Sequence, residues 1–142
     1  MPDKNFKVFA TMADIGIEVR GTDIKNLIYN SIIGFSELLG KFRKNSGIEQ
    51  NKQTIKIRFE SYESLIVKVL NELLYIYEVK ELRLIGIDKI FVKEGTFQGN
   101  FKFGKIKNNN FIINNSIKAV THHNIKIEKK RKYYYIKIIM DI

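Results

Sequence analysis

The sequence contains no cysteine, no tryptophan, a single proline and only two histidines among its 142 residues. The lack of cysteine excludes disulfides, thiolate metal ligands and a thiol nucleophile. With two histidines, a zinc site would need Asp or Glu to complete its ligand set. No apolar run approaches the roughly 18 residues that a membrane span requires, and residues 1–6 do not lead into the apolar stretch of a signal peptide. We therefore expect a cytoplasmic protein with no membrane partner.

Motifs that bind or hydrolyse nucleotides are also missing. The sequence contains neither GxGxxG nor GxxxxGK[ST], and it has no GxSxG turn that would present a nucleophilic serine. A nucleotide-hydrolysing enzyme and a serine hydrolase are therefore not expected, and the residues offer no catalytic set.

The formal charge of +10 at pH 7 fits either a polyanionic partner or a solvated surface. Twenty of the 25 basic residues are Lys and five are Arg, although Arg is the preferred side chain for binding bases and phosphates. We therefore expect any contact with tRNA to be weak or indirect.

Apolar periodicity predicts seven strands and two helices. A period of two residues indicates strands, a period of 3.6 indicates helices, and Thr22 or Asp23 and Ser61 are the expected helix N-caps. Segments 41–53 and 108–115 are predicted loops, although Phe111–Ile113 can also dock on the body. The predicted fold class is α+β, a two-layer sandwich with two helices on a mainly antiparallel sheet, in one domain over residues 1–142. The predicted strands are 6–12, 15–20, 54–60, 82–94, 96–107, 118–129 and 133–142, and the helices run from 24 to about 40 and onward from Ser61.

The last predicted strand has one wholly apolar face, and its other face ends at Asp141. This side chain is adjacent to the main-chain carboxylate of Ile142, and two such acids are oxygen ligands suited to Ca²⁺ or Mg²⁺. Asp14 lies at a break between two strand-like runs, where an acid either forms a turn or is aimed at a shared ion. A solvated surface role is the alternative for both aspartates. His122 and His123 are expected to face opposite sides of a strand, in structural or surface roles.

Four segments, in the same order along the chain, resemble the archease family. They are ADIGI at 13–17, LIVKVLNELLY at 65–75, KAVTHH at 118–123 and MDI at 140–142. The chain departs from the family pattern at Thr11 and Met12, where the family usually has His-Thr, at Lys68-Val69, and at His122, where Tyr is usual.

The resemblance implies an accessory protein, not an enzyme, that activates the tRNA-splicing RNA ligase by promoting its guanylylation and multiple turnover. It also implies a divalent-metal site built from Asp14, Asp141 and the C-terminal carboxylate of Ile142, with Ca²⁺ expected and Mg²⁺ or Mn²⁺ possible. Lys118, Thr121 and His123 are candidates to line this site. The alternatives are a modulator or chaperone of a tRNA methyltransferase, a metal-dependent phosphoesterase, and a free-standing RNA-binding module.

Overall fold

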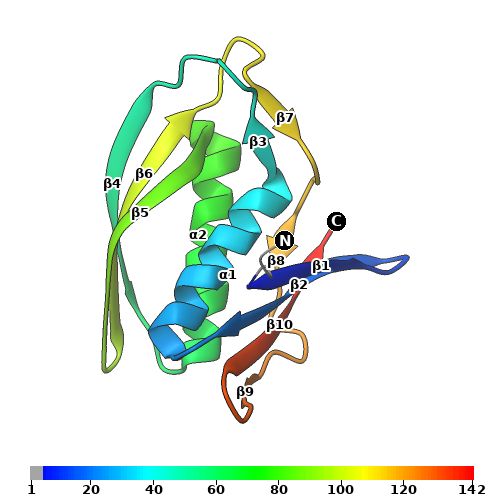
Figure 1. Cartoon of the computed structure of the whole chain (residues 1–142), viewed down its shortest axis with the longest axis vertical. Coiled ribbons are helices and arrows are strands. Elements are labelled where there is room, and N and C mark those ends of the chain that lie inside the picture. Colours follow the sequence, from blue (N-terminus) through cyan, green and yellow to red (C-terminus); the bar gives the residue numbers. More distant parts are fainter. Residues whose placement is uncertain (1–4) are drawn as a thin grey trace.

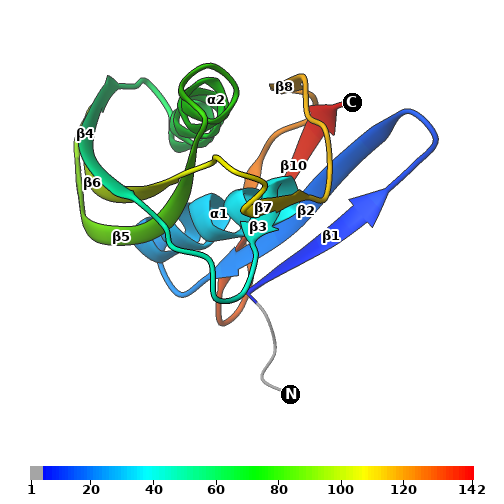
Figure 2. The same ribbon diagram turned by 90° about the horizontal axis from the view of Figure 1, so that it is seen from above.

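Two helices lie between two antiparallel sheets in the computed structural model, which describes residues 5–142 (Figures 1 and 2). The expectation about a signal peptide concerned residues 1–6, of which residues 1–4 lie outside the described residues. The α+β class and the mainly antiparallel pairing predicted from the sequence are confirmed. The elements are β1 (Phe6–Ala10), β2 (Asp14–Gly21), α1 (Ile24–Leu39), β3 (Gly40–Phe42), β4 (Gln50–Arg58), α2 (Tyr62–Lys80), β5 (Leu82–Lys93), β6 (Thr96–Lys105), β7 (Phe111–Ile113), β8 (Ala119–Val120), β9 (Ile127–Lys129) and β10 (Tyr134–Asp141).

The strands form a five-stranded sheet, a three-stranded sheet and a short two-stranded ribbon. The five-stranded sheet has the order β1-β2-β10-β8, with β9 also paired to β10. The three-stranded sheet has the order β4-β6-β5, and β3 pairs with β7. The last strand of the chain therefore lies inside its sheet, where it joins the first strands to the segments that precede it (Figure 1).

Both helices begin at the N-caps that the sequence predicts. The Asp23 carboxylate accepts a hydrogen bond from the Asn26 amide at 2.7 Å, and the Ser61 hydroxyl accepts one from the Ser64 amide at 3.1 Å. The apolar faces of α1 and α2 are buried with the inner faces of both sheets in one core cluster. Fully buried members include Phe35, Leu70, Phe101, Ile136 and Ile138.

Two predicted boundaries are wrong. Segment 41–53, predicted as a loop, contains part of β3 and the first residues of β4, because β7 and β6 supply pairing partners that local sequence does not reveal. The predicted strand 118–129 is interrupted after Val120, and the chain turns before β9. Asn124 adopts a left-handed backbone with φ of 50°, and Thr121 Oγ1 accepts a hydrogen bond from the His123 amide at 3.2 Å, which stabilises this turn.

Within residues 5–142, neither helix combines the length and the apolar character that crossing a membrane would demand.

Candidate metal centre at the end of the five-stranded sheet

Two aspartates from the two ends of the sequence are direct cross-strand neighbours. Asp14 is the first residue of β2, Asp141 is the last residue of β10, and the antiparallel register pairs them. The buried residues on either strand, Ile15 on β2 and Met140 on β10, point into the core. Because side chains alternate along a strand, both aspartates belong to the outer face of the sheet. The sequence alone did not show that these two residues meet.

The main-chain hydrogen bonds of both aspartates point away from each other. The Asp14 amide donates to Thr11 Oγ1 at 3.1 Å, and the Asp14 carbonyl accepts from the Thr11 amide at 2.9 Å. On the other strand, the Asp141 carbonyl accepts from the Lys118 amide at 2.8 Å. Asp14 and Asp141 are therefore a non-hydrogen-bonded pair, the type in which opposing side chains are closest, with Cβ atoms about 4.5–5.5 Å apart.

This pair of like charges has no protein counter-ion within residues 5–142. No Lys, Arg or His nitrogen lies within 4.0 Å of either carboxylate among the ion pairs of this part of the chain. Asp141 is exposed and Asp14 is half-buried. Since like charges directly opposite each other destabilise a sheet, a bound cation would relieve the repulsion between these two side chains.

Neighbouring rows of the same face are arranged differently. Lys137 on β10 is paired in register with Glu18 on β2, and the Tyr135 hydroxyl donates a 2.5 Å hydrogen bond to the Glu18 carboxylate. Partial burial and this acceptor raise the pKa of the Tyr135 phenol above its ordinary value. Acid faces base or hydroxyl along this stretch, whereas the two aspartates face each other.

The side chains of the site number two, fewer than a calcium ion requires. Within residues 5–142 no group of three or more His, Asp or Glu side chains is close enough to hold a metal ion. The third predicted ligand, the main-chain carboxylate of Ile142, follows Asp141 directly. Ile142 lines an open hollow of about 450 Å³ together with Lys118, Tyr77 and Glu78. Ca²⁺ takes six to eight oxygen ligands, so water and main-chain oxygens would have to complete the shell.

Of the three residues predicted to line the site, Thr121 has a structural role. Its amide and its hydroxyl both donate to the Ile139 carbonyl, at 3.0 and 2.9 Å, and so fasten the end of β8 to β10. Lys118 is exposed and contacts Asp141 through its main chain. His122 and His123 are exposed in the turn after β8, so the prediction that they occupy opposite faces of a strand is wrong.

Sequence reasoning missed Asn71, which holds β8 in place. Its side-chain amide donates to the Val120 carbonyl at 3.0 Å, and its oxygen accepts from the Val120 amide at 2.9 Å. Asn71 thus replaces a strand along the free edge of β8, the strand whose other edge pairs with Met140 and Asp141. The available signal was one polar residue between Val67 and Leu74 on the buried face of α2.

Comparisons with known proteins agree over nearly the whole chain. Proteins named archease from Archaeoglobus fulgidus and Sulfurisphaera tokodaii are each 28% identical to it, over 134 and 144 residues. These alignments cover 92% and 98% of this chain and 93% and 99% of the relatives.

Two solved structures share the fold. The solution structure of Methanobacterium thermoautotrophicum protein 1598 has a TM-score of 0.69 at 23% identity, covering 99% of this chain and 100% of the other. The crystal structure of a Thermotoga maritima protein described as an archease, possible chaperone, has a TM-score of 0.64 at 18% identity, covering 96% of each chain. The archease protein family itself matches residues 6–142, and this chain therefore belongs to that family.

Proposed function

We propose that this protein is an accessory factor of the tRNA-splicing RNA ligase, which it activates by promoting guanylylation and repeated turnover of that enzyme. Membership of the archease family supports this role. The description of the Thermotoga relative as a possible chaperone also favours action on a partner protein over catalysis by the chain itself. The single observation that carries the proposal is the direct pairing of Asp14 with Asp141 on an exposed sheet face.

In this proposal Asp14, Asp141 and the terminal carboxylate of Ile142 hold one divalent cation, with Ca²⁺ the expected ion. The two side chains and the chain end are hard oxygen donors, and Ca²⁺ accepts irregular sets of such ligands more readily than Mg²⁺. A bound cation would offset the mutual repulsion of the carboxylates and leave coordination places for a phosphate oxygen or a group of the partner. The aspartates themselves orient the ion, since the strand pairing fixes both main chains.

Calcium binding to the purified protein tests the site without any partner. Titration calorimetry should detect one ion per chain, and Asp14→Asn and Asp141→Asn should each weaken binding by about tenfold or more, because affinity follows the charge of the ligand set. Glu94→Gln is the matched control, since Glu94 is an exposed acid in the turn between β5 and β6. Equal affinity of all four proteins would refute the site.

Ligation assays with the ligase of the same organism test the role. The wild-type protein should increase the number of ligated products per ligase molecule, the Glu94→Gln control should do the same, and Asp141→Asn should not. If Asp141→Asn stimulates as well as wild type, the aspartate pair does not mediate the effect. If the wild-type protein itself gives no stimulation, the ligase is not the client.

An extension of two residues beyond Ile142 isolates the third ligand. It keeps every side chain and displaces the carboxylate that follows Asp141. We expect weaker calcium binding with an unchanged thermal transition in the absence of calcium. Unchanged calcium affinity would remove Ile142 from the ligand set.

A further inference from the structure

The outer face of the three-stranded sheet is a regular grid of polar side chains. Its inner face, which carries Phe97, Phe101 and Phe103, is buried against the helices. The register aligns every second residue of β4, β6 and β5 in four rows on the opposite face. The rows are Lys52-Lys102-Gly86, Thr54-Asn100-Lys89, Lys56-Gln98-Phe91 and Arg58-Thr96-Lys93.

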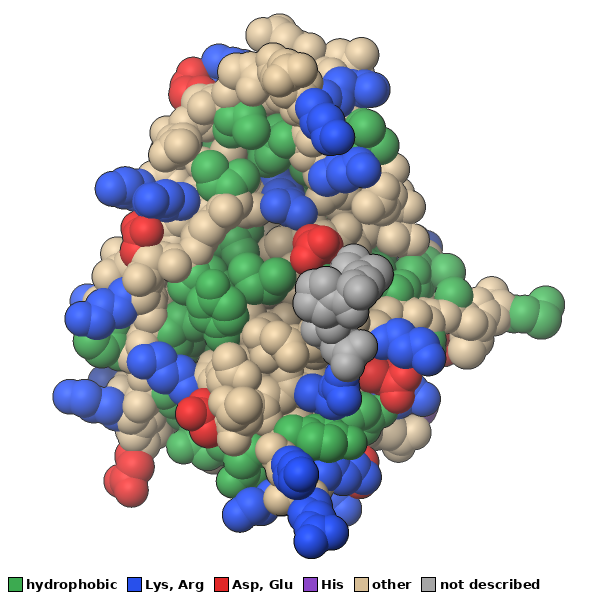
Figure 3. Space-filling view, viewed as in Figure 1, with side chains coloured by type: hydrophobic (Ala, Val, Ile, Leu, Met, Phe, Trp, Pro, Cys, Tyr) green, Lys and Arg blue, Asp and Glu red, His purple; other side chains and the backbone are tan. Residues whose placement is uncertain are grey.

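Positive charge dominates this basic face, as we name the four rows. Six of the twelve positions are Lys or Arg, and Figure 3 shows basic side chains projecting along the edge of the molecule that this sheet forms. Asp88, beside the grid at a β-bulge, pairs with Lys102 at 3.4 Å. Six cations and this carboxylate give a charge of +5, half of the formal +10 of the chain. Within residues 5–142, the other four side chains on β4 and at the end of β5 have no acid within 4.0 Å; they are Lys52, Lys56, Arg58 and Lys93.

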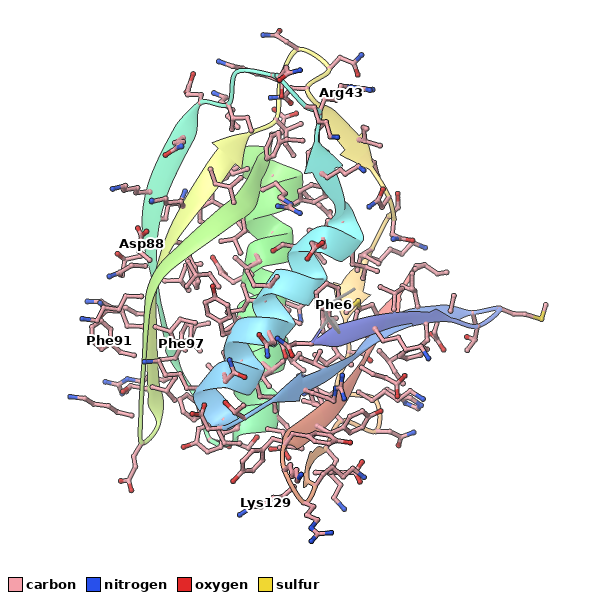
Figure 4. The ribbon with its side chains drawn as sticks, in the orientation of Figure 1. Phe6, Arg43, Asp88, Phe91, Phe97 and Lys129 are labelled. Carbon is pink, nitrogen blue, oxygen red and sulfur yellow. The ribbon has the colours of Figure 1, made fainter. Side chains whose placement is uncertain are left out.

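One large aromatic side chain stands on this face. Phe91 exposes 41% of its surface, and Figure 4 shows it on the outer side of the sheet, opposite Phe97. The Lys89 ammonium lies 4.7 Å from the centroid of the Phe91 ring. An exposed ring with a cation beside it offers a stacking surface for a base and a partner for its phosphate.

The middle of the basic face is uncharged but can form hydrogen bonds. Thr54 Oγ1 donates to Asn100 Oδ1 at 3.0 Å, which leaves the Asn100 amide nitrogen as a donor toward solvent. Gln98 and Thr96 continue this line along the central strand. An open hollow of about 640 Å³ lies over this region, bordered by cations from both edge strands; its lining includes Lys56, Arg58, Phe91, Lys93, Thr96 and Gln98.

We propose that the basic face binds single-stranded nucleic acid. Cations on both edges match a phosphate backbone, the ring of Phe91 matches a base, and the central amides match the hydrogen-bonding edges of unpaired bases. An acidic protein segment would use the cations alone and would gain nothing from an exposed ring. The basic face lies on the side of the molecule away from the end of β10 in both ribbon views (Figures 1 and 2), so the proposal does not depend on the metal site.

Removing charge from the basic face tests the electrostatic part. Binding of the full-length protein to fluorescein-labelled oligouridylate and oligodeoxythymidylate is measured by anisotropy over a range of salt concentrations. The triple variant Lys56→Gln, Arg58→Gln, Lys93→Gln should lower the slope of log K against log salt by about 2, since each lost phosphate contact on a single strand contributes about 0.7. The matched control replaces two lysines and one arginine that are exposed elsewhere, Lys44→Gln, Lys126→Gln, Arg131→Gln.

Phe91→Ala tests the stacking part. It should weaken binding of the oligonucleotide about 5- to 150-fold, the range for loss of one stacked base, while the salt slope stays unchanged because no charge is removed. Thermal melting of every variant should match wild type, since the substituted side chains are exposed.

Each alternative has its own result. Equal losses in the two triple variants would mean that overall charge attracts the probe, and the assigned face would be wrong. Competition by polyglutamate as effective as that by unlabelled oligonucleotide would assign the face to acidic protein instead. A duplex that binds as tightly as the single strand, or full binding by Phe91→Ala, would also overturn the proposal. Tighter binding of the uridylate than of the thymidylate would identify RNA as the source of the single strand.

Discussion

Replacing Asn71 by Ala should destabilise the protein far more than its half-buried position on α2 suggests. The side chain makes two hydrogen bonds, one with the amide and one with the carbonyl of Val120. Val120 is only 4% exposed, and its main-chain groups face α2 because the β8–β10 bonds are made by Lys118 and Thr121 on either side. Alanine would therefore leave a buried donor and a buried acceptor without partners.

The expected loss follows from the cost of unsatisfied groups. Each buried polar group left without a partner costs about 1–3 kcal/mol, so the free energy of unfolding should fall by about 2–4 kcal/mol. For a chain of this size that corresponds to a decrease of about 6–12 °C in Tm. Helix propensity acts in the opposite direction, because Ala is the better helix former, and this offsets only a few tenths of a kcal/mol.

Urea denaturation of wild type, Asn71→Ala and Glu72→Ala measures the effect. Glu72 is the exposed neighbour of Asn71 on α2, so its variant controls for propensity without loss of a tertiary contact. Hydrogen exchange should also become faster at the Val120 amide, whose acceptor is removed, and change little at the Ile66 amide in the middle of α2. A destabilisation below about 0.5 kcal/mol, or unchanged exchange at Val120, would refute the view that Asn71 anchors β8.

Three further predictions concern other parts of the fold. Gly16→Ala should cost about 1–3 kcal/mol in urea denaturation, because the added Cβ would overlap the Ile138 carbonyl and the Phe9 ring, whereas Gly47→Ala, with open space around it, should be tolerated. Arg83→Met should cost about 2–4 kcal/mol, because the guanidinium donates to the carbonyls of Ser36 and Gly40 at the end of α1, at 3.2 and 2.8 Å; an unchanged Tm would contradict this. The raised pKa of Tyr135 means that the folded protein keeps this proton longer than the unfolded chain, whose value is 10.0, so stability should fall as the pH rises above about 10 and should fall less in Tyr135→Phe. Identical pH profiles of the two proteins would show that the Tyr135 hydroxyl is not coupled to folding.

The long elements could be predicted from the sequence because their apolar residues are local and periodic. The alternation from Tyr134 to Met140 matches β10, and Asp23 and Ser61 mark the helix starts. The short strands could not be predicted in the same way. β3, β7 and β8 have two or three residues each, and they are strands only because a distant segment supplies hydrogen bonds.

The candidate site was accessible from the sequence only through resemblance. Composition and spacing gave two isolated aspartates, each with an ordinary role on a surface or in a turn. Their juxtaposition depends on the register of β2 with β10, which the packing of Ile15, Ile17 and Val19 against the core fixes. Asn71 was missed because its partners are main-chain atoms of a strand 49 positions away.

The interior position of β10 has a consequence for biosynthesis. Tyr135 and Glu18, which meet across β10 and β2, are 117 positions apart. A ribosome releases β1 and β2 long before β10 exists, so these strands emerge with the edge that β10 will cover still unpaired. The helices and the three-stranded sheet depend on nearer contacts and can form during translation, whereas the two aspartates come together only when synthesis has passed residue 141.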